Sequence, residues 1–167
     1  MKPSIERDDL RIVRPLLLGV IAFACVGTAG ELLLIEHTEE FTQWIPLLAI
    51  GLGLVATGAL AARPSRVTVQ LFRVLMSFFI GAGVLGIILH YRGNAEFELE
   101  MRPSMAGLEL VWNSLTGATP ALAPGSLVPI GLVGIIATFR HPAMAGGRRA
   151  GSPGSRQEDE ESQEGTT

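Results

Sequence analysis

A carboxylate and an imidazole are the side chains of this sequence best placed to take part in chemistry. Each lies close to the end of a long apolar segment. Glu31 lies near the end of the first apolar segment, and His90 is at the end of the third. A carboxylate inside a membrane is costly unless it is paired or used. Ala24, Gly27 and Thr28 share its helical face, so we expect Glu31 to point towards neighbouring helices. Contact with His90, direct or through water, would form an ion or proton site.

Further acids and a histidine lie in the connections that follow these two residues. Three interpretations are open: a solvated acidic surface, a vestibule that attracts cations or relays protons, and a metal site. Local ligand spacings such as His-x-x-x-His or Cys-x-x-Cys are absent from the sequence, so we assign no metal. The residues of this acidic and histidine cluster are Glu36, His37, Glu39, Glu40, Glu96, Glu98 and Glu100.

Sequence motifs of common enzyme classes are missing. The chain has no Gly-x-Ser-x-Gly elbow, phosphate-binding glycine loop, His-Glu-x-x-His motif or dinucleotide fingerprint. Its one cysteine, Cys25, has no partner for a disulfide or a zinc site. The 13 basic residues are outnumbered by 16 acids, which argues against nucleic-acid binding. We therefore expect no enzymatic activity and no cofactor.

The elements that must position these residues are apolar helices. Apolar residues make up 48% of the 167 residues and charged residues only 17%, and the mean hydropathy is +0.39. About 20 apolar helical residues cross a hydrocarbon layer of about 30 Å. Segments of about this length occupy residues 15–35, 44–62, 67–90 and 121–139. We predict an all-α polytopic protein with a four-helix transmembrane bundle, whose last helix either bends or begins after Pro124, because it contains Pro124 and Pro129.

The basic residues outside these segments predict the orientation, since cytoplasmic loops are enriched in Lys and Arg. Only Arg92 and Arg102 belong to the opposite side. We therefore expect the inner (plasma) membrane, with an amino-terminal arm (1–14) and a disordered tail (140–167) both in the cytoplasm. The basic residues on the cytoplasmic side are Lys2, Arg7, Arg11, Arg14, Arg63, Arg66, Arg140, Arg148, Arg149 and Arg156.

An alternative to the first crossing is a cleavable signal peptide. Ala22 and Ala24 match the small-x-small pattern of a cleavage site, and Cys25 follows them. Cleavage would leave three crossings and would place the two ends on opposite sides. The acids within the arm and the apolar sequence that continues to Gly30 favour an uncleaved helix.

Small residues predict where the helices pack, because lipid gives no hydrophobic drive for association and close backbone approach matters instead. The second segment has a ridge with a spacing of four residues, and glycines in the third and fourth segments could receive it. A dimer seam is the alternative use of these glycines. The expected packing residues are Ala49, Gly53, Thr57, Ala61, Gly81, Gly86, Gly131 and Gly134. The expected interfacial anchors are Trp44, Arg73 and Trp112.

The outer loop, residues 91–120, is too long for a simple turn. Acidic and apolar residues alternate over 96–101, which predicts a short extended segment. Beyond it, Ser104 is placed to cap an amphipathic helix in which Leu108, Val111, Trp112 and Leu115 share one arc. Such a helix would lie flat on the outer leaflet or cap the bundle, either for packing alone or as a docking surface.

The predicted function is that of a non-enzymatic accessory or assembly subunit of a membrane complex. Its expected partners are the lipid bilayer and either another membrane protein or further copies of itself. The alternative is a small oligomeric transporter or proton-coupled carrier that uses Glu31 near the outer face. A membrane enzyme with an outward-facing acidic site is a third interpretation.

Overall fold

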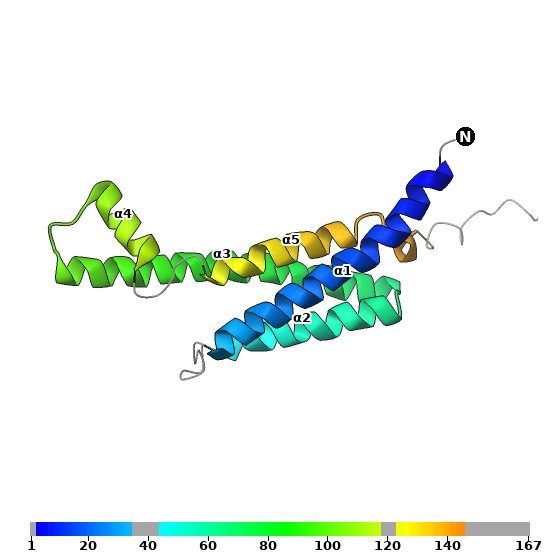
Figure 1. Ribbon diagram of the computed structural model, residues 1–167, viewed down its shortest axis with the longest axis horizontal. Helices are drawn as coiled ribbons and strands as arrows, with labels where there is room; N and C mark the ends of the chain where they lie inside the picture. Colours follow the sequence, from blue (N-terminus) through cyan, green and yellow to red (C-terminus); the bar gives the residue numbers. More distant parts are fainter. Residues whose placement is uncertain (1–2, 35–43, 118–122, 146–167) are drawn as a thin grey trace, which may run out of the picture.

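The computed structural model describes residues 3–34, 44–117 and 123–145, and all its regular elements there are helical. The predicted all-α class is therefore confirmed. In chain order the elements are α1 (Pro3–Leu34), α2 (Trp44–Ala62), α3 (Arg66–Met101), α4 (Gly107–Thr116), the 3-10 turn η2 (Ala123–Ser126), α5 (Leu127–Ala137) and the 3-10 turn η3 (Pro142–Met144) (Figure 1). Residues 36–40 and 146–167, which include Glu36, His37, Glu39, Glu40 and most of the expected tail, lie outside the described residues.

Helices α1, α2, α3 and α5 form a bundle in which consecutive members run in opposite directions (Figure 1). Both α1 and α3 pack against α2 and α5, which places α1 and α3 on a diagonal. The core between them contains the buried side chains Ile21, Cys25, Ile50, Phe72, Met76 and Phe79.

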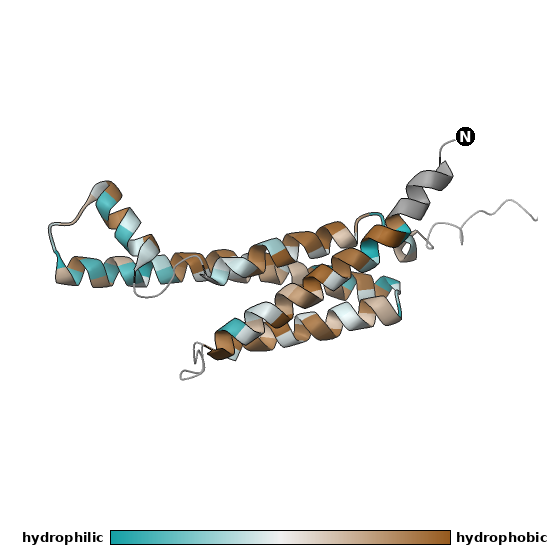
Figure 2. Ribbon diagram, viewed as in Figure 1, coloured by the Kyte–Doolittle hydropathy of each residue, from teal (hydrophilic) through white to brown (hydrophobic). Residues whose placement is uncertain are grey.

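Three helices are long and apolar enough to cross a membrane: residues Leu10–Leu34 of α1, the whole of α2, and α3. Hydrophobic residues predominate along the helices of the bundle (Figure 2). Many of their large apolar side chains face outward, among them the exposed Phe23 and Val74. Exposed apolar surface on this scale is unfavourable in water and favourable in lipid. These helices therefore indicate a membrane-associated protein.

The fourth apolar segment begins its α-helix after Pro124, which is one of the two expected alternatives, and the helix is shorter than the expected range 121–139. The α-helix covers only the 11 residues of α5, which at 1.5 Å per residue is about 16 Å. Pro124 lies in η2, and Pro129 occupies the first turn of α5, where its missing N–H costs no hydrogen bond. The α-helix thus begins only after the 3-10 turn that contains Pro124, and residues 121–126 are not part of it.

The connection between α2 and α3 is short and tightly capped. Pro64 follows the end of α2 and cannot continue it. Ser65 then caps α3: its Oγ accepts the N–H of Thr68 at 3.1 Å, and Thr68 Oγ1 accepts the N–H of Ser65 at 2.7 Å. This reciprocal capping box fixes the point at which α3 begins.

Substitution of Ser65 by alanine should lower the free energy of unfolding by about 1 kcal/mol, because the first turn of α3 loses its capping acceptor. Denaturant titration in mixed micelles would measure the change. Ser77→Ala, at an exposed position of the same helix, is the matched control and should have little effect. Equal losses in both variants would contradict the role of the cap.

Glycines bring the helices of the bundle together at several of the expected positions. A Cβ added at Gly53 would meet the ring of Phe79, and one at Gly86 would meet Pro124. Gly131 and Gly134 both lie against Met76. Ala49 and Thr57 are also buried, whereas Ala61 and Gly81 are exposed on the outside of the bundle.

Candidate functional site

Helix α3 is longer than a bilayer needs. Its 36 residues span about 54 Å, against about 30 Å of hydrocarbon. With a typical tilt of about 20°, the helix would still extend over about 50 Å along the membrane normal. The apolar stretch ends at Leu89, and charged residues begin at Arg92. The last turns of α3 therefore extend beyond the part suited to lipid.

Two expectations for the outer loop are wrong. Residues 96–101 form the end of α3 and not an extended segment, and the N-cap position of α4 is occupied by Ala106, which makes no side-chain capping bond, and not by Ser104. The loop expected from residue 91 begins only after Met101. The alternation of acidic and apolar residues gave a wrong prediction, because residues that continue an existing helix keep its backbone hydrogen bonds. They do so whatever the pattern of their side chains.

Helix α4 folds back against the end of α3, and together they form what we call the distal hairpin, residues 92–117 (Figure 1). The buried Asn94 side chain donates to the backbone oxygen of Ser114 at 2.8 Å. Gly117 packs closely against the same amide, since a Cβ added there would lie 3.1 Å from the Asn94 amide carbon. Among the described residues, α4 makes its substantial contacts with α3, so it does not cap the bundle.

An arginine also joins the two arms of the distal hairpin. Arg102 pairs with Glu98 on α3 at 2.9 Å and with Glu109 on α4 at 3.3 Å. The arginine and Glu109 are exposed, so this network adds orientation more than stability. It also engages Glu98, one of the acids that the sequence suggests for an outer cluster.

Hydrophilic and hydrophobic residues are interspersed along the distal hairpin (Figure 2), and several of its large apolar side chains are exposed. Leu108 is 87% exposed and Trp112 68% exposed, and their spacing of four residues places them on one face of α4. Phe97 and Met101 form a similar pair on α3, with Met101 68% exposed. Charged neighbours such as Glu100 are exposed as well.

Glu31 lies beside a groove between α1 and α5. The groove has a volume of about 370 Å³. Ala24, Gly27 and Thr28 line it together with Glu31, and Pro129 is among the α5 residues opposite. The shared helical face is thus as expected, but the Glu31 side chain is exposed at the groove and not enclosed by helices.

His90 and Glu31 belong to α3 and α1, the two helices on a diagonal of the bundle. Glu96 and Glu100 are exposed on the last turns of α3. Within residues 3–34, 44–117 and 123–145, no group of three or more acids, histidines or cysteines is placed to hold a metal ion.

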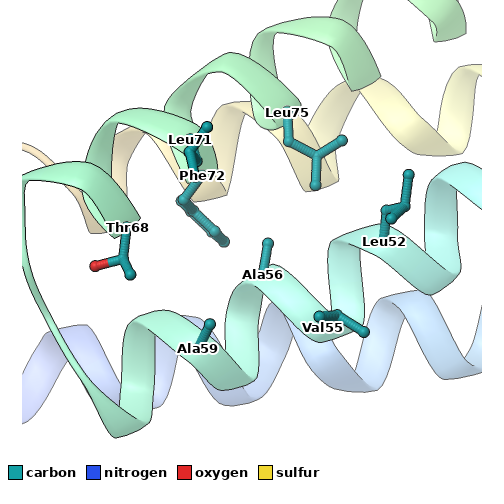
Figure 3. A pocket seen from close by; sticks show the side chains of 8 residues that line it. All are labelled: Leu52, Val55, Ala56, Ala59, Thr68, Leu71, Phe72 and Leu75. Carbon is teal, nitrogen blue, oxygen red and sulfur yellow. The ribbon is translucent and has the colours of Figure 1, made fainter.

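A second hollow, of about 350 Å³, lies between α2 and α3 (Figure 3). Its lining is apolar except for the hydroxyl of Thr68, which is already part of the capping box. The side chains around it include Leu52, Val55, Leu71 and Leu75 (Figure 3). This surface suits lipid contact and carries no group for chemistry.

At the opposite end from the distal hairpin, arginines hold the end of α5. Arg73 donates from Nε to Thr138 Oγ1 at 3.0 Å and from Nη2 to the Thr138 backbone oxygen. Arg14 donates to the backbone oxygens of Phe139 and Arg140 at 3.1 and 3.0 Å. These guanidinium groups satisfy carbonyls that the helix leaves free, at its negative end.

From the sequence, Arg73 is expected only to be an interfacial anchor, and Arg14 has no expected partner. The feature that could have indicated these contacts is the carboxyl end of the fourth apolar segment. Its last carbonyl groups lack helical partners, and it lies on the same side as Arg14 and Arg73. Among the other expected anchors, Trp44 and Trp112 are both exposed.

His141 makes the arginine-rich end sensitive to acid. Its Nδ1 accepts the N–H of Ala143 at 3.2 Å. Burial, together with the charges of Arg14 and Arg73, lowers the pKa of His141 below its ordinary value of 6.5. The neutral ring is therefore the form that the folded protein prefers.

Acidification should weaken this end of the protein. The contribution of His141 to the free energy of unfolding is complete above pH 6.5. It is lost as the pH falls towards the lowered pKa, because the unfolded chain takes up the proton first. The melting temperature in detergent should thus fall less between pH 7.5 and 5 in His141→Asn than in the parent protein. Identical pH profiles for the two proteins would contradict this account.

Searches against protein-family models, curated proteins and solved structures found no match to this chain. The fold and the distribution of exposed side chains therefore carry the functional argument.

Proposed function

We propose that the protein is a non-enzymatic accessory or assembly subunit of a membrane complex, and that the distal hairpin holds its partner. The observation that carries this proposal is the exposure of Leu108, Trp112, Phe97 and Met101 on a part of the chain that extends past the apolar length of α3. Lipid can cover the outward faces of the bundle. The apolar side chains of the distal hairpin lie beyond that region, and a protein partner would bury them.

The chemistry of the hairpin matches that of a protein interface. Aromatic residues and methionine are enriched at the centres of interfaces, and charged residues form the rim. Trp112 and Phe97 supply aromatic surface here, and Glu100, Arg102 and Glu109 are exposed charged residues of the same hairpin. The internal Asn94 and Arg102 contacts hold the hairpin in one shape before a partner binds, which lowers the entropy cost of binding.

The charge distribution supports one orientation in the plasma (inner) membrane. Arginines 11, 14, 63, 66, 73 and 140 lie at or near the end where α1 begins and α5 ends. The acids whose side chains the structure describes lie on α1's last turn, on the distal part of α3 and on α4. By the positive-inside rule, both termini belong in the cytoplasm and the hairpin on the opposite side.

Site-specific photo-crosslinking in living cells tests the proposal. A photoreactive amino acid at Trp112 should yield a discrete adduct with another membrane protein. The same amino acid at Val55, on the exposed face of α2, is the matched control and should give lipid adducts only. Adducts only between copies of this chain would replace the accessory role by self-assembly, and the absence of any protein adduct at Trp112 would contradict both.

An oligomeric proton-coupled carrier is the second candidate, favoured by the groove that Glu31 lines. In this case Glu31→Gln should abolish proton-dependent solute uptake into reconstituted vesicles, since the amide cannot release a proton. Glu96→Gln, an exposed acid on α3, serves as the control. Unchanged uptake in Glu31→Gln would remove the residue on which the carrier interpretation depends.

A further inference from the structure

The last turns of α3 carry exposed acidic and apolar side chains on neighbouring stripes of the helix. Phe97 and Met101 are exposed, and so are Glu96 and Glu100. Each glutamate directly precedes one of the apolar residues. A rotation of about 100° per residue therefore places the two pairs side by side along the helix. We call these four residues the α3 stripe.

The two carboxylates of the α3 stripe have no ion-pair partner among the described residues. The ion pairs of the distal hairpin join Arg102 to Glu98 and to Glu109 instead. With Arg92 included, the hairpin contains two arginines and four glutamates, which leaves two net negative charges. The α3 stripe thus presents uncompensated negative charge beside its apolar pair.

The rest of this sequence supplies no cation to the same side of the bundle. Residues 35–43 and 118–122 contain no lysine or arginine. Arg14 joins the beginning of α1 to the end of α5, and the apolar length of α3 separates that end from the distal hairpin. Lipid around this length would keep both chain ends away from the α3 stripe. The basic residues of the chain ends whose side chains the structure does not describe are Lys2, Arg7, Arg148, Arg149 and Arg156.

This charge selects among the surfaces that could cover the α3 stripe. A lipid headgroup layer carries phosphates, and anionic lipids attract basic and not acidic segments. The same stripe of a second copy would bring glutamates opposite glutamates, which is unfavourable. A partner surface with both apolar and basic residues would bury Phe97 and Met101 and would also pair the two carboxylates.

We propose that the partner of the distal hairpin contacts the α3 stripe with a segment in which lysine or arginine residues flank apolar ones. This inference rests on the accessory function proposed above and adds the chemistry of the partner. Complementary charge of this kind speeds association and makes binding sensitive to salt. Arg92 precedes Glu96 by four residues, on the same helical stripe, and would oppose such a partner.

Charge variants that carry a photoreactive amino acid at Gly93 test the proposal in living cells. Gly93 is exposed one turn before Phe97, and no described atom lies within 4 Å of a Cβ added there. Glu96→Gln/Glu100→Gln should lower the yield of the protein adduct at least fivefold, because both carboxylates are lost and the apolar pair remains. Arg92→Gln is the matched control of opposite sign and should raise the yield.

Two synthetic peptides test the chemistry of the partner directly on the purified full-length protein. Both have the same pattern of leucines, with lysine at the other positions in one peptide and glutamate in the other. The lysine peptide should give at least fivefold more adduct at Gly93, and Glu96→Gln/Glu100→Gln should abolish the difference. The peptide comparison in the parent protein does not depend on the folding of any charge variant.

Equal labelling by the two peptides would overturn the inference, as would lipid adducts alone at Gly93 or equal losses of the cellular adduct in both charge variants. If a protein adduct at Trp112 persists in these cases, only the basic character of the partner is wrong. If Trp112 gives no protein adduct, the accessory function itself fails.

Discussion

Replacement of Gly131 by valine is expected to prevent the bundle from forming a stable structure. A Cβ at this position would lie 2.5 Å from the backbone oxygen of Met76 and 2.7 Å from the Ile80 side chain. The backbone of α3 cannot yield as a side chain can, so α5 would have to move away. Overpacking of this kind costs about 1–3 kcal/mol in ordinary cores, and a backbone clash should exceed that range.

The size-exclusion profile and melting temperature of the purified protein measure this effect. Gly131→Val should aggregate or melt at least 10 °C below the parent protein. Gly81→Val, on the outward face of α3 with nothing within 4 Å of the added Cβ, is the matched control. A Gly131 variant as stable as its control would show that α5 does not pack on α3 as described.

The second large effect concerns the partner of the distal hairpin. Leu108→Ser/Trp112→Ser should reduce recovery of the partner at least tenfold in a detergent pull-down. A few central aromatic and apolar residues carry most of the energy of an interface, and tenfold corresponds to about 1.4 kcal/mol. Because both side chains are exposed, the melting temperature should change little.

Leu52→Ser/Val55→Ser provides the control for this double variant. Both side chains are exposed and apolar, but they belong to the lipid-suited helix α2. Partner recovery should be unaffected in the control. Equal recovery by hairpin and control variants would mean that the exposed face of α4 does not carry the interaction.

Apolar length and composition predicted the helical class, because a bilayer requires long runs of apolar helical residues. The α2 helix begins at Trp44 and ends at Ala62, the limits expected from sequence. The end of α2 is encoded by residues next to it in the sequence: Pro64 cannot continue α2, and Ser65 is the N-cap of α3. Local signals of this kind need no knowledge of tertiary contacts.

The end of α3 was not predictable by the same means. The alternation of Glu and apolar residues over 96–101 fits a strand, yet these residues continue a helix already formed. Asn94 reaches Ser114, 20 residues later in the chain, and this contact gives the distal part of α3 a neighbour. Such a pairing depends on the path of the whole chain.

The candidate site was predictable only in part. The face of α1 that carries Glu31, Gly27 and Thr28 lines a groove, and helical periodicity is enough to group these residues. Which helix lies opposite is a matter of packing: α5 occupies that place, and α3 with His90 lies on the diagonal. The contacts of Arg14 and Arg73 with the end of α5 likewise follow from the return of the chain.

Cysteine accessibility in intact cells tests most directly the claim that the distal hairpin and the arginine-rich end lie on opposite sides of the membrane. In a Cys25→Ala background, a membrane-impermeant maleimide should label Glu100→Cys at once and Arg63→Cys only after the membrane is permeabilised. Labelling of both sites in intact cells, or of Arg63→Cys alone, would contradict the account.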